Sequence, residues 1–507
     1  MPNSSVRDEF GGKSGLRAWS AFACIAIFIV AFALRWPSCG DSFWLDELHT
    51  AWAVDGAWSD VGARAGIGNQ QPIYFYLLWV WRQLLPVFAV DFYGIEASLR
   101  LTSVVMTSLS AGLLCWLVFR RSGSLIAGVV AGLMIGIESS AIFFGTELRP
   151  YAAIVLLSTC AMGLAMIPRD RVGSGDRFLL HAVVILAALT QVTSLVTLGW
   201  LLAWVIASDW ISGRGTADRV RTFVSRHWMV GLWIAGSAAW FFQHSSLWQS
   251  RSSWQSFANA ESLVQLWELW PWMPVILVPA VIWGVSRMRR GYPVCSKGES
   301  SIAMLGFVLL ISAISCFCLS YFGGVPLWHR RYLISGLPFL CGLSGILLGC
   351  VRTSDRQTWR ELMVGLMGAA YLLLLVSQQG TLNRLIHGQF QLTHRGEDWR
   401  RATRFLAKHK SSNEVVWVDA GLIEQSRYPT FVEEPGREAY FRYPVNGPYR
   451  MEAAVGLGRD GLTAWLAQED VKYLIRRGSG SRVNAKLVGI DVHGFGGVMV
   501  MIRKPLN

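Results

Sequence analysis

Two adjacent carboxylates, Asp46 and Glu47, follow closely behind the first long apolar run of the sequence, within the stretch 44–49. An ionisable group beside a bilayer costs free energy, so such groups commonly mark a functional site. A carboxylate near an apolar boundary has a raised pKa and can act as a general base at neutral pH. Glu147, which abuts the third apolar run, is the third candidate of this kind.

A set of arginines forms the second chemical signal. Eight remain when the predicted inner segments and the C-terminal part are set aside: Arg35, Arg64, Arg82, Arg100, Arg149, Arg251, Arg330 and Arg331. Some are expected to be interface anchors that snorkel to water. Their negative partners are lipid head groups, nearby carboxylates or a phosphate-bearing substrate. A phosphate fits well, because the planar guanidinium binds two of its oxygens at once.

Histidines near these acids raise the question of a metal. His49, His244 and His329 are the histidines of the predicted outer loops that lie nearest these acids. With Glu147 they could hold a divalent ion. Their spacing matches no metal motif, so a divalent metal is only a candidate cofactor. No other cofactor is expected.

The composition places these residues in a membrane protein. Of the 507 residues, 53% are hydrophobic and 16% are charged. The net charge of +13 could suggest a nucleic-acid partner, but many of the basic residues lie in short gaps between apolar segments. That distribution is the positive-inside pattern of an integral membrane protein, so no nucleic-acid partner is expected.

The apolar runs predict a polytopic α-helical protein with about eleven spans, within a range of ten to thirteen. They lie at about 17–34, 98–119, 124–144, 151–167, 178–190, 192–207, 228–242, 271–285, 302–321, 332–351 and 361–376. Residues 72–90 are ambiguous. If they span, every basic gap moves to the outer side, so the positive-inside rule favours a juxtamembrane segment.

The resulting topology predicts two parts. Residues 1–376 form a transmembrane module in the inner (cell) membrane, with a cytoplasmic N-terminus and a first outer loop at 35–97. Residues 377–507 form a small extracytoplasmic α/β domain, with a helix from Glu397 to Lys410. The strand-like runs of this domain are Glu414–Val418, Val471–Ile475 and Val498–Arg503.

The order of several short motifs resembles that of a known family. These motifs are Asp46-Glu47, Gln70-Gln71-Pro72-Ile73-Tyr74-Phe75-Tyr76, Leu99-Arg100-Leu101-Thr102-Ser103, Thr146-Glu147-Leu148-Arg149-Pro150-Tyr151 and Arg331-Tyr332-Leu333-Ile334 with Pro338. The pattern resembles the GT-C membrane glycosyltransferases of the protein O-mannosyltransferase and aminoarabinose lipid A transferase superfamily (family 39 type). The resemblance covers about residues 17–350.

This resemblance implies an inverting transfer of a monosaccharide from a polyprenyl-phosphate donor to an acceptor hydroxyl on the outer face. It implies that Asp46 is the base, that Glu47 supports it and that Glu147 serves the acceptor or a metal. The residues implied to bind the donor phosphate are Arg149, Arg330 and Arg331. Those implied to line the donor and acceptor channel are Gln71, Tyr74, Tyr76, Tyr151 and Tyr332.

The sequence leaves two rival functions and the partners open. A transporter or flippase for a lipid-linked glycan would also need many spans. That function predicts ionisable residues inside the spans and repeated halves, whereas the spans carry few charges and the sequence has no internal repeat. A non-catalytic assembly partner that binds through its outer domain is the other rival. Besides membrane lipids and the donor, the acceptor could be a glycan, a lipid or a protein.

Overall fold

The structure is a computed structural model. It describes residues 5–68, 70–85, 94–168, 170–212, 215–233, 236, 258–270, 273–290, 296–350, 357–409, 415–419, 450–453, 461–467, 470–478 and 489–504. The chain divides into two units, which are described separately. The first comprises Met1–Pro37, Ser103–Thr146 and Pro150–Leu392, and the second comprises Ser38–Thr102, Glu147–Arg149 and Thr393–Asn507.

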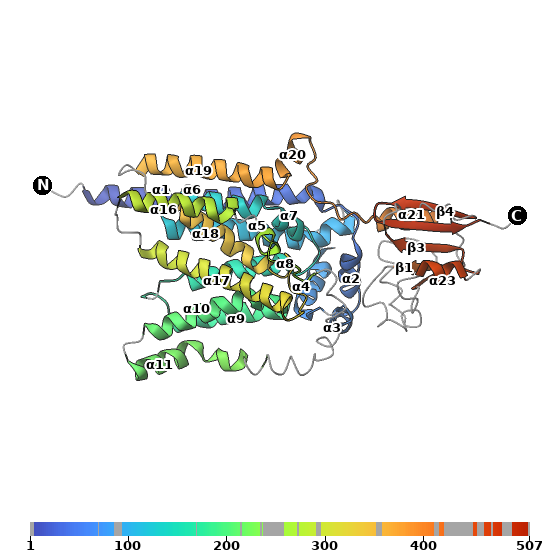
Figure 1. The fold of residues 1–507 in the computed structure, drawn as a ribbon, viewed down its shortest axis with the longest axis horizontal. Coiled ribbons are helices and arrows are strands. Elements are labelled where there is room, and N and C mark those ends of the chain that lie inside the picture. The colour runs from blue at the N-terminus through green and yellow to red at the C-terminus, as the bar shows by residue number, and fades with distance from the viewer. Residues whose placement is uncertain are drawn as a thin grey trace. The chain divides into compact units, whose positions relative to one another are not determined.

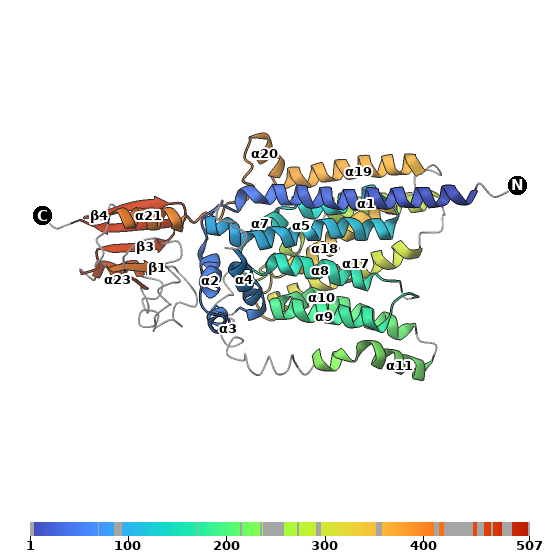
Figure 2. The same ribbon diagram turned by 180° about the vertical axis from the view of Figure 1, so that it is seen from behind.

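The first unit is made of helices, and its long helices run side by side (Figures 1 and 2). They are α1 (Ser5–Arg35), α5 (Gly94–Ser122, which begins in the second unit), α6 (Leu125–Ile137), α7 (Ser139–Gly145), α8 (Tyr151–Ala165), α9 (Ser174–Thr190), α10 (Leu195–Ile211), α11 (Thr216–His227), α16 (Val278–Arg290), α17 (Ser296–Tyr321), α18 (Leu337–Gly349), α19 (Gln357–Gln378) and α20 (Thr381–Ile386). Shorter turns are α15 (Gln265–Glu268) and four others, at Trp36–Ser38, Val192–Ser194, Met273–Leu277 and Ile334–Gly336.

These helices confirm a multi-pass α-helical membrane protein. In the described part of the chain, five helices are long and apolar enough to cross a bilayer, or six if the bent pair α6 and α7 is one span. Three shorter apolar helices accompany them. The exact span count stays a prediction, and the expected run at 228–242 lies largely outside the described residues.

The predicted run 124–144 is two helices rather than one. They meet at 59°, and Glu138 stands at the break. Its Oε2 accepts a hydrogen bond of 2.7 Å from the N–H of Ala141. A carboxylate that satisfies a free N–H at a helix start stabilises a new first turn, which explains why the apolar run does not continue as a single helix.

Small residues bring the first helices into close contact. A Cβ added at Gly132 of α6 would lie 2.8 Å from the carbonyl oxygen of Ala111 and 2.9 Å from a side-chain carbon of Ile27. Buried Arg35 of α1 donates to the carbonyls of Gly136 and Ile135 at 2.9 and 3.0 Å. Close backbone approach and a side chain that caps the last carbonyls therefore join α1, α5 and α6.

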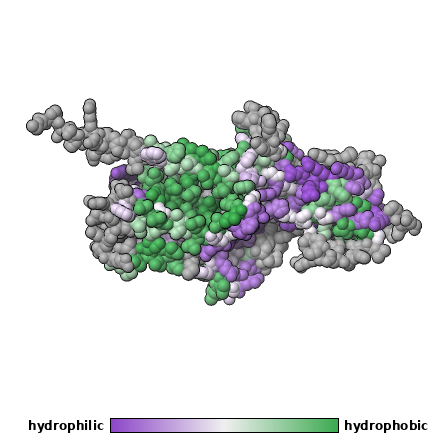
Figure 3. Space-filling model, turned by 90° about the horizontal axis from the view of Figure 1, so that it is seen from above, coloured by the Kyte–Doolittle hydropathy of each residue, from purple (hydrophilic) through white to green (hydrophobic). Residues whose placement is uncertain are grey.

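The outer faces of the helices are apolar, as a lipid environment requires. Along α1, Trp19, Phe22, Ile25 and Ile29 are exposed at helical spacing. A broad hydrophobic surface covers the helices of the first unit in Figure 3. Such a patch would be an aggregation hazard in water but fits the hydrocarbon core of a bilayer.

The second unit carries three short helices from the segment between α1 and α5. These are α2 (Leu45–Ala53), α3 (Trp58–Ile67) and α4 (Pro72–Leu84). Pro72 at the start of α4 has the φ that a first helical turn needs. The described part of α4 has 13 residues. The juxtamembrane assignment of 72–90 stays a prediction, and 86–90 lie outside the described residues.

The same unit contains a five-stranded sheet, which confirms the predicted small α/β domain. Its strand order is β2-β1-β3-β5-β4. The strands are β1 (Val415–Asp419), β2 (Arg450–Ala453), β3 (Tyr473–Arg477), β4 (Ile490–Phe495) and β5 (Val498–Arg503), with helices α21 (Trp399–His409) and α23 (Gly461–Ala467). β1 pairs in parallel with β2 and β3, and β5 pairs antiparallel with β3 and β4. The runs predicted as strands correspond to β1, β3 and β5.

Candidate active site

Asp46 and Glu47 occupy the first turn of α2, yet their environments differ. Neighbouring residues on a helix point about 100° apart. Asp46 keeps 28% of its side chain exposed, whereas Glu47 is 0% exposed. Glu47 also accepts a hydrogen bond of 3.3 Å from the N–H of Trp44, which closes the start of the helix. Only Asp46 of this pair is open to a substrate.

Glu47 is one partner of a buried ion pair. Its Oε1 accepts from Nε of Arg100 at 2.9 Å and from the N–H of Leu148 at 2.8 Å, and its Oε2 pairs with Nη2 of Arg100. Burial favours the neutral form of Glu47, but the charge and hydrogen bonds of Arg100 outweigh it and lower the pKa of Glu47. Glu47 therefore stays ionised and fixes the loop, and its supporting role toward Asp46 stays a prediction.

Arg100 also orders the chain just before α2. Its guanidinium donates to the carbonyl oxygens of Cys39, Asp41 and Ser42 at 2.8, 2.6 and 3.2 Å. Sequence reasoning placed Arg100 among the outer arginines and in a motif but gave it no role. The signal that could have indicated its role is a charged residue inside an otherwise apolar run.

Arg149 lies beside the exposed acid. Its Nη2 is 3.8 Å from Oδ2 of Asp46, and its Nη1 is 3.5 Å from the Asp46 carbonyl oxygen. Arg149 itself is largely buried. The structure thus brings together the predicted base and one predicted phosphate-binding residue. A carboxylate and a guanidinium at this spacing can face a hydroxyl and a phosphate at the same time.

Glu147 is a second buried acid of the same unit. Burial raises its pKa to about 7, and the positive charge of Arg395 opposes that rise. Glu147 therefore changes protonation near neutral pH. Burial lowers the pKa of Arg395, and the negative charges of Glu147 and Glu47 oppose that fall. Arg395 was not predicted, because it lies in the tail sequence among many other basic residues.

His49 is buried on α2. Burial is the main cause that lowers its pKa to about 4, so the ring is neutral at physiological pH. Its Nε2 lies 3.0 Å from the Arg64 carbonyl oxygen, which favours the tautomer that donates this hydrogen bond. Among the residues that the structure describes, no three side chains of His, Cys, Asp or Glu form a group suited to a metal. His244 lies outside those residues.

The predicted channel residues of the second unit lie on or beside α4. Gln71 is the residue just before the helix, and Tyr74 is buried within the unit. Tyr76 packs against Trp58 of α3 with ring centroids 4.3 Å apart. Tyr74 and Tyr76 are two residues apart on a helix and so face different sides. Their predicted channel role is not tested by these contacts.

The remaining predicted residues belong to the first unit. There Arg330 donates to the Glu268 carbonyl at 3.1 Å, and Arg331 donates to the Tyr332 hydroxyl at 2.8 Å. Burial, together with both arginines, lowers the pKa of His329 to about 4. Buried Tyr151 packs against Phe144. The donor-binding and channel roles of these side chains stay predictions.

Glu397 connects the first turn of α2 with the sheet of the second unit. It accepts hydrogen bonds from the Leu45 N–H at 3.1 Å, from Trp399 Nε1 at 2.8 Å and from Arg477 Nε at 2.6 Å. A separate ion pair of 3.1 Å joins Arg400 of α21 to Glu96 at the start of α5. The acids on α2 are thus held in place by residues far away in the sequence.

Comparisons with known proteins identify the fold. No family model matches the sequence, and no curated protein matches it. The solved structure of ArnT from Cupriavidus metallidurans bound to undecaprenyl phosphate is similar over 96% of this chain and 98% of that chain, with a TM-score of 0.50 and 13% identity. Arabinofuranosyltransferase AftD from Mycobacteria follows with a TM-score of 0.43 and 15% identity, covering 96% of this chain and 41% of that chain. The likeness to ArnT confirms the predicted GT-C fold.

Proposed function

We propose that this protein is an inverting glycosyltransferase that moves a hexose or pentose from a polyprenyl-phosphate donor to an acceptor hydroxyl on the outer face of the membrane. The observation that carries the proposal is the pairing of a partly exposed acid, Asp46, with Arg149 at 3.8 Å, on a loop fixed by the buried pair of Glu47 and Arg100. The fold likeness to ArnT, described as bound to undecaprenyl phosphate, supports a donor of this class.

The reaction follows from the chemistry of these groups. Asp46 takes the proton of the acceptor hydroxyl while the acceptor oxygen forms a bond to the anomeric carbon. The bond between that carbon and the phosphate oxygen breaks, and its electron pair leaves with the polyprenyl phosphate. Attack opposite the leaving group inverts the anomeric configuration. Proton removal of this kind contributes roughly 10²–10⁴-fold to rate.

Arginine stabilises the charge that grows on the leaving phosphate. Arg149 is the arginine next to Asp46, and its guanidinium can donate two hydrogen bonds to phosphate oxygens. Arg330 and Arg331 are assigned to the same task from the family resemblance alone. Glu147, with a pKa of about 7, can accept or release a proton while the acceptor binds. Preorganised donors of this kind are commonly the largest catalytic contribution.

The test is a transfer assay with the full chain reconstituted in vesicles. Radiolabelled polyprenyl-phosphate monosaccharides serve as donors, nucleotide sugars as negative controls, and mixed glycans, lipids and peptides as acceptors. We expect product from a polyprenyl-phosphate donor only, with the opposite anomeric configuration. Movement of the intact donor between leaflets without transfer would instead support the flippase and contradict the proposal.

A further inference from the structure

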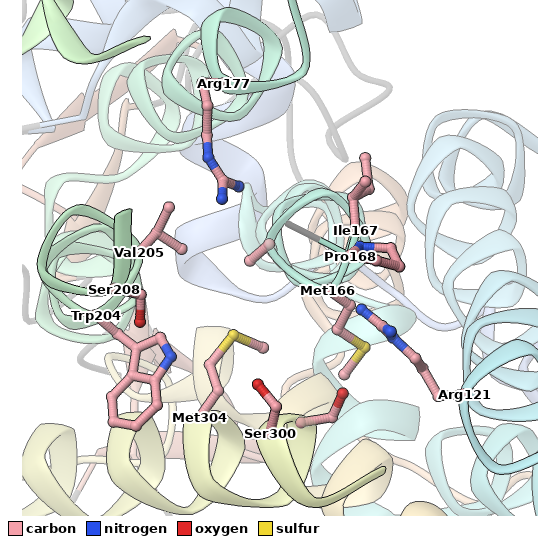
Figure 4. A pocket seen from close by; sticks show the side chains of 12 residues that line it. Arg121, Met166, Ile167, Pro168, Arg177, Trp204, Val205, Ser208, Ser300 and Met304 are labelled. Carbon is pink, nitrogen blue, oxygen red and sulfur yellow. The ribbon is translucent and has the colours of Figure 1, made fainter. Parts of the chain in front are cut away.

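A cavity of about 300 Å³ lies in the first unit, at the end of the helix bundle where α5, α8 and α10 end and α9 and α17 begin (Figure 4). It contains none of the predicted site residues. Its lining is Arg121, Ala165, Met166, Ile167, Pro168, Arg177, Trp204, Val205, Ser208, Ser300, Ser301 and Met304. The positive-inside rule places this end of the bundle on the cytoplasmic side.

A buried arginine presents an unused donor to this cavity. Arg177 is 2% exposed, and its Nε and Nη2 donate to the carboxylate of Asp209 at 2.8 and 3.1 Å. Its Nη1 has no hydrogen-bond partner among the described residues. Figure 4 shows the guanidinium pointing into the cavity. A buried N–H without an acceptor is costly, so the cavity is suited to a ligand that supplies one.

The charges around the cavity favour an anionic ligand, whose oxygens accept hydrogen bonds. The lining residues described by the structure include two arginines and no acid. The nearby Asp209 is already engaged by Arg177, by His227 at 3.3 Å and by Arg226 at 3.8 Å. The hydroxyls of Ser208 and Ser300 add further donors. Guanidinium and hydroxyl groups converging on one space are suited to a phosphate.

The rest of the lining is apolar. Met166, Trp204, Val205 and Met304 face the same cavity as the arginines (Figure 4). The helices α5, α10 and α17 that contribute to it are among those able to cross a bilayer. A small soluble anion would leave these apolar side chains without a partner, whereas the glycerol and first methylenes of a lipid would cover them.

We propose that this cavity binds the phosphate of an anionic glycerophospholipid from the membrane leaflet at the α5 C-terminus, with Arg177 Nη1, Arg121 and the serine hydroxyls as donors. Basic pockets between transmembrane helices on the cytoplasmic side commonly bind lipid head groups. The site is separate from the proposed transfer chemistry and does not depend on it.

The test measures binding to the purified full chain in neutral detergent. The probes are dioctanoyl phosphatidylglycerol, inorganic phosphate and dioctanoylglycerol, and titration by native mass spectrometry gives each dissociation constant. We expect the wild type to bind phosphatidylglycerol at least tenfold more tightly than either other probe. Equal binding of inorganic phosphate, or of dioctanoylglycerol, would overturn the lipid assignment.

Two cavity variants and a matched control assign the site. Arg121→Gln is expected to weaken phosphatidylglycerol binding at least tenfold. Arg120→Gln removes the neighbouring exposed arginine, which stacks on Trp116 at 5.2 Å, and is expected to change nothing. Ser208→Val serves as a second cavity variant if Arg121→Gln does not fold, as judged by its melting temperature. Unchanged binding in the folded cavity variants would contradict the proposal.

Discussion

Each unit contains a buried arginine–carboxylate ion pair, and the two pairs have the same chemistry but different surroundings. The side chains of Glu47 and Arg100 are 0% and 1% exposed, and the side chains of Asp209 and Arg177 are 1% and 3% exposed. The first pair stands next to a partly exposed acid and fixes it. The second leaves one guanidinium N–H directed into a cavity without acids among its described lining residues. In our two proposals, an ion pair of one type therefore supports proton transfer in one unit and anion binding in the other.

The largest expected effect comes from breaking the Glu47 pair. Glu47→Gln leaves the Arg100 charge buried without its counter-ion, so the free energy of unfolding should fall by about 3–5 kcal/mol. Chemical denaturation in detergent measures it. Glu261→Gln, at an exposed position of the first unit, should change stability by less than about 0.5 kcal/mol.

Asp209→Asn sharpens the comparison. It should cost stability in the same way, because it removes the partner of buried Arg177. Transfer activity per folded molecule should persist in Asp209→Asn and be lost in Glu47→Gln. Equal activity of the two variants would mean that the Glu47 pair has no special relation to Asp46.

The pH dependence of stability tests the environment of Glu147. Burial raises the folded-state pKa of this group from 4.5 to about 7. Between these values the folded state binds more protons than the unfolded state, so the free energy of unfolding falls as pH rises, at up to roughly 1.4 kcal/mol per unit. Below about pH 4.5 the contribution of Glu147 to stability does not change with pH.

Denaturation of wild type and Glu147→Gln at about pH 5 and about pH 8 isolates this contribution. The wild type should lose stability relative to Glu147→Gln at the higher pH. Parallel stability changes in the two proteins would show that Glu147 keeps an ordinary pKa.

Glu397→Gln is expected to lower stability less, because its ion-pair partner Arg477 is 38% exposed and the pair is screened by water. The loss of one charge-assisted hydrogen bond should lower stability by about 1 kcal/mol. It should also lower the transfer rate several-fold, since Glu397 holds the Leu45 N–H at the start of α2. Asp491→Asn removes an exposed pair with Lys504 in the same unit and should leave the rate unchanged.

Much of the fold could be predicted from the sequence, because hydrophobic length and turn residues are local signals. The predicted run Val498–Arg503 coincides with β5. β4 was missed although its first four residues, 490–493, alternate between apolar and polar side chains, because the run is short and Gly494 interrupts it. The break at Glu138 was missed because one cap residue within an apolar run gives little pattern.

The candidate site was predicted in part, for a related reason. Asp46, Glu147 and Arg149 stood out because charge beside an apolar run is rare. The link between Glu397 and Leu45 joins residues 352 positions apart, and that between Arg100 and Glu47 joins residues 53 apart. Such partners become visible only once the chain is folded, so Arg100, Arg395 and Glu397 received no role.

The most direct test of the account is the steady-state kinetics of Asp46→Asn. Asn has nearly the same shape but cannot take a proton, and Asp46 is partly exposed, so folding should be preserved. We predict that kcat falls roughly 10²–10⁴-fold, while the melting temperature and the KM for the polyprenyl-phosphate donor stay close to those of wild type. Asp60→Asn, at an exposed acid of α3, should retain full activity. A well-folded Asp46→Asn protein with wild-type kcat would contradict the assignment of Asp46 as the base.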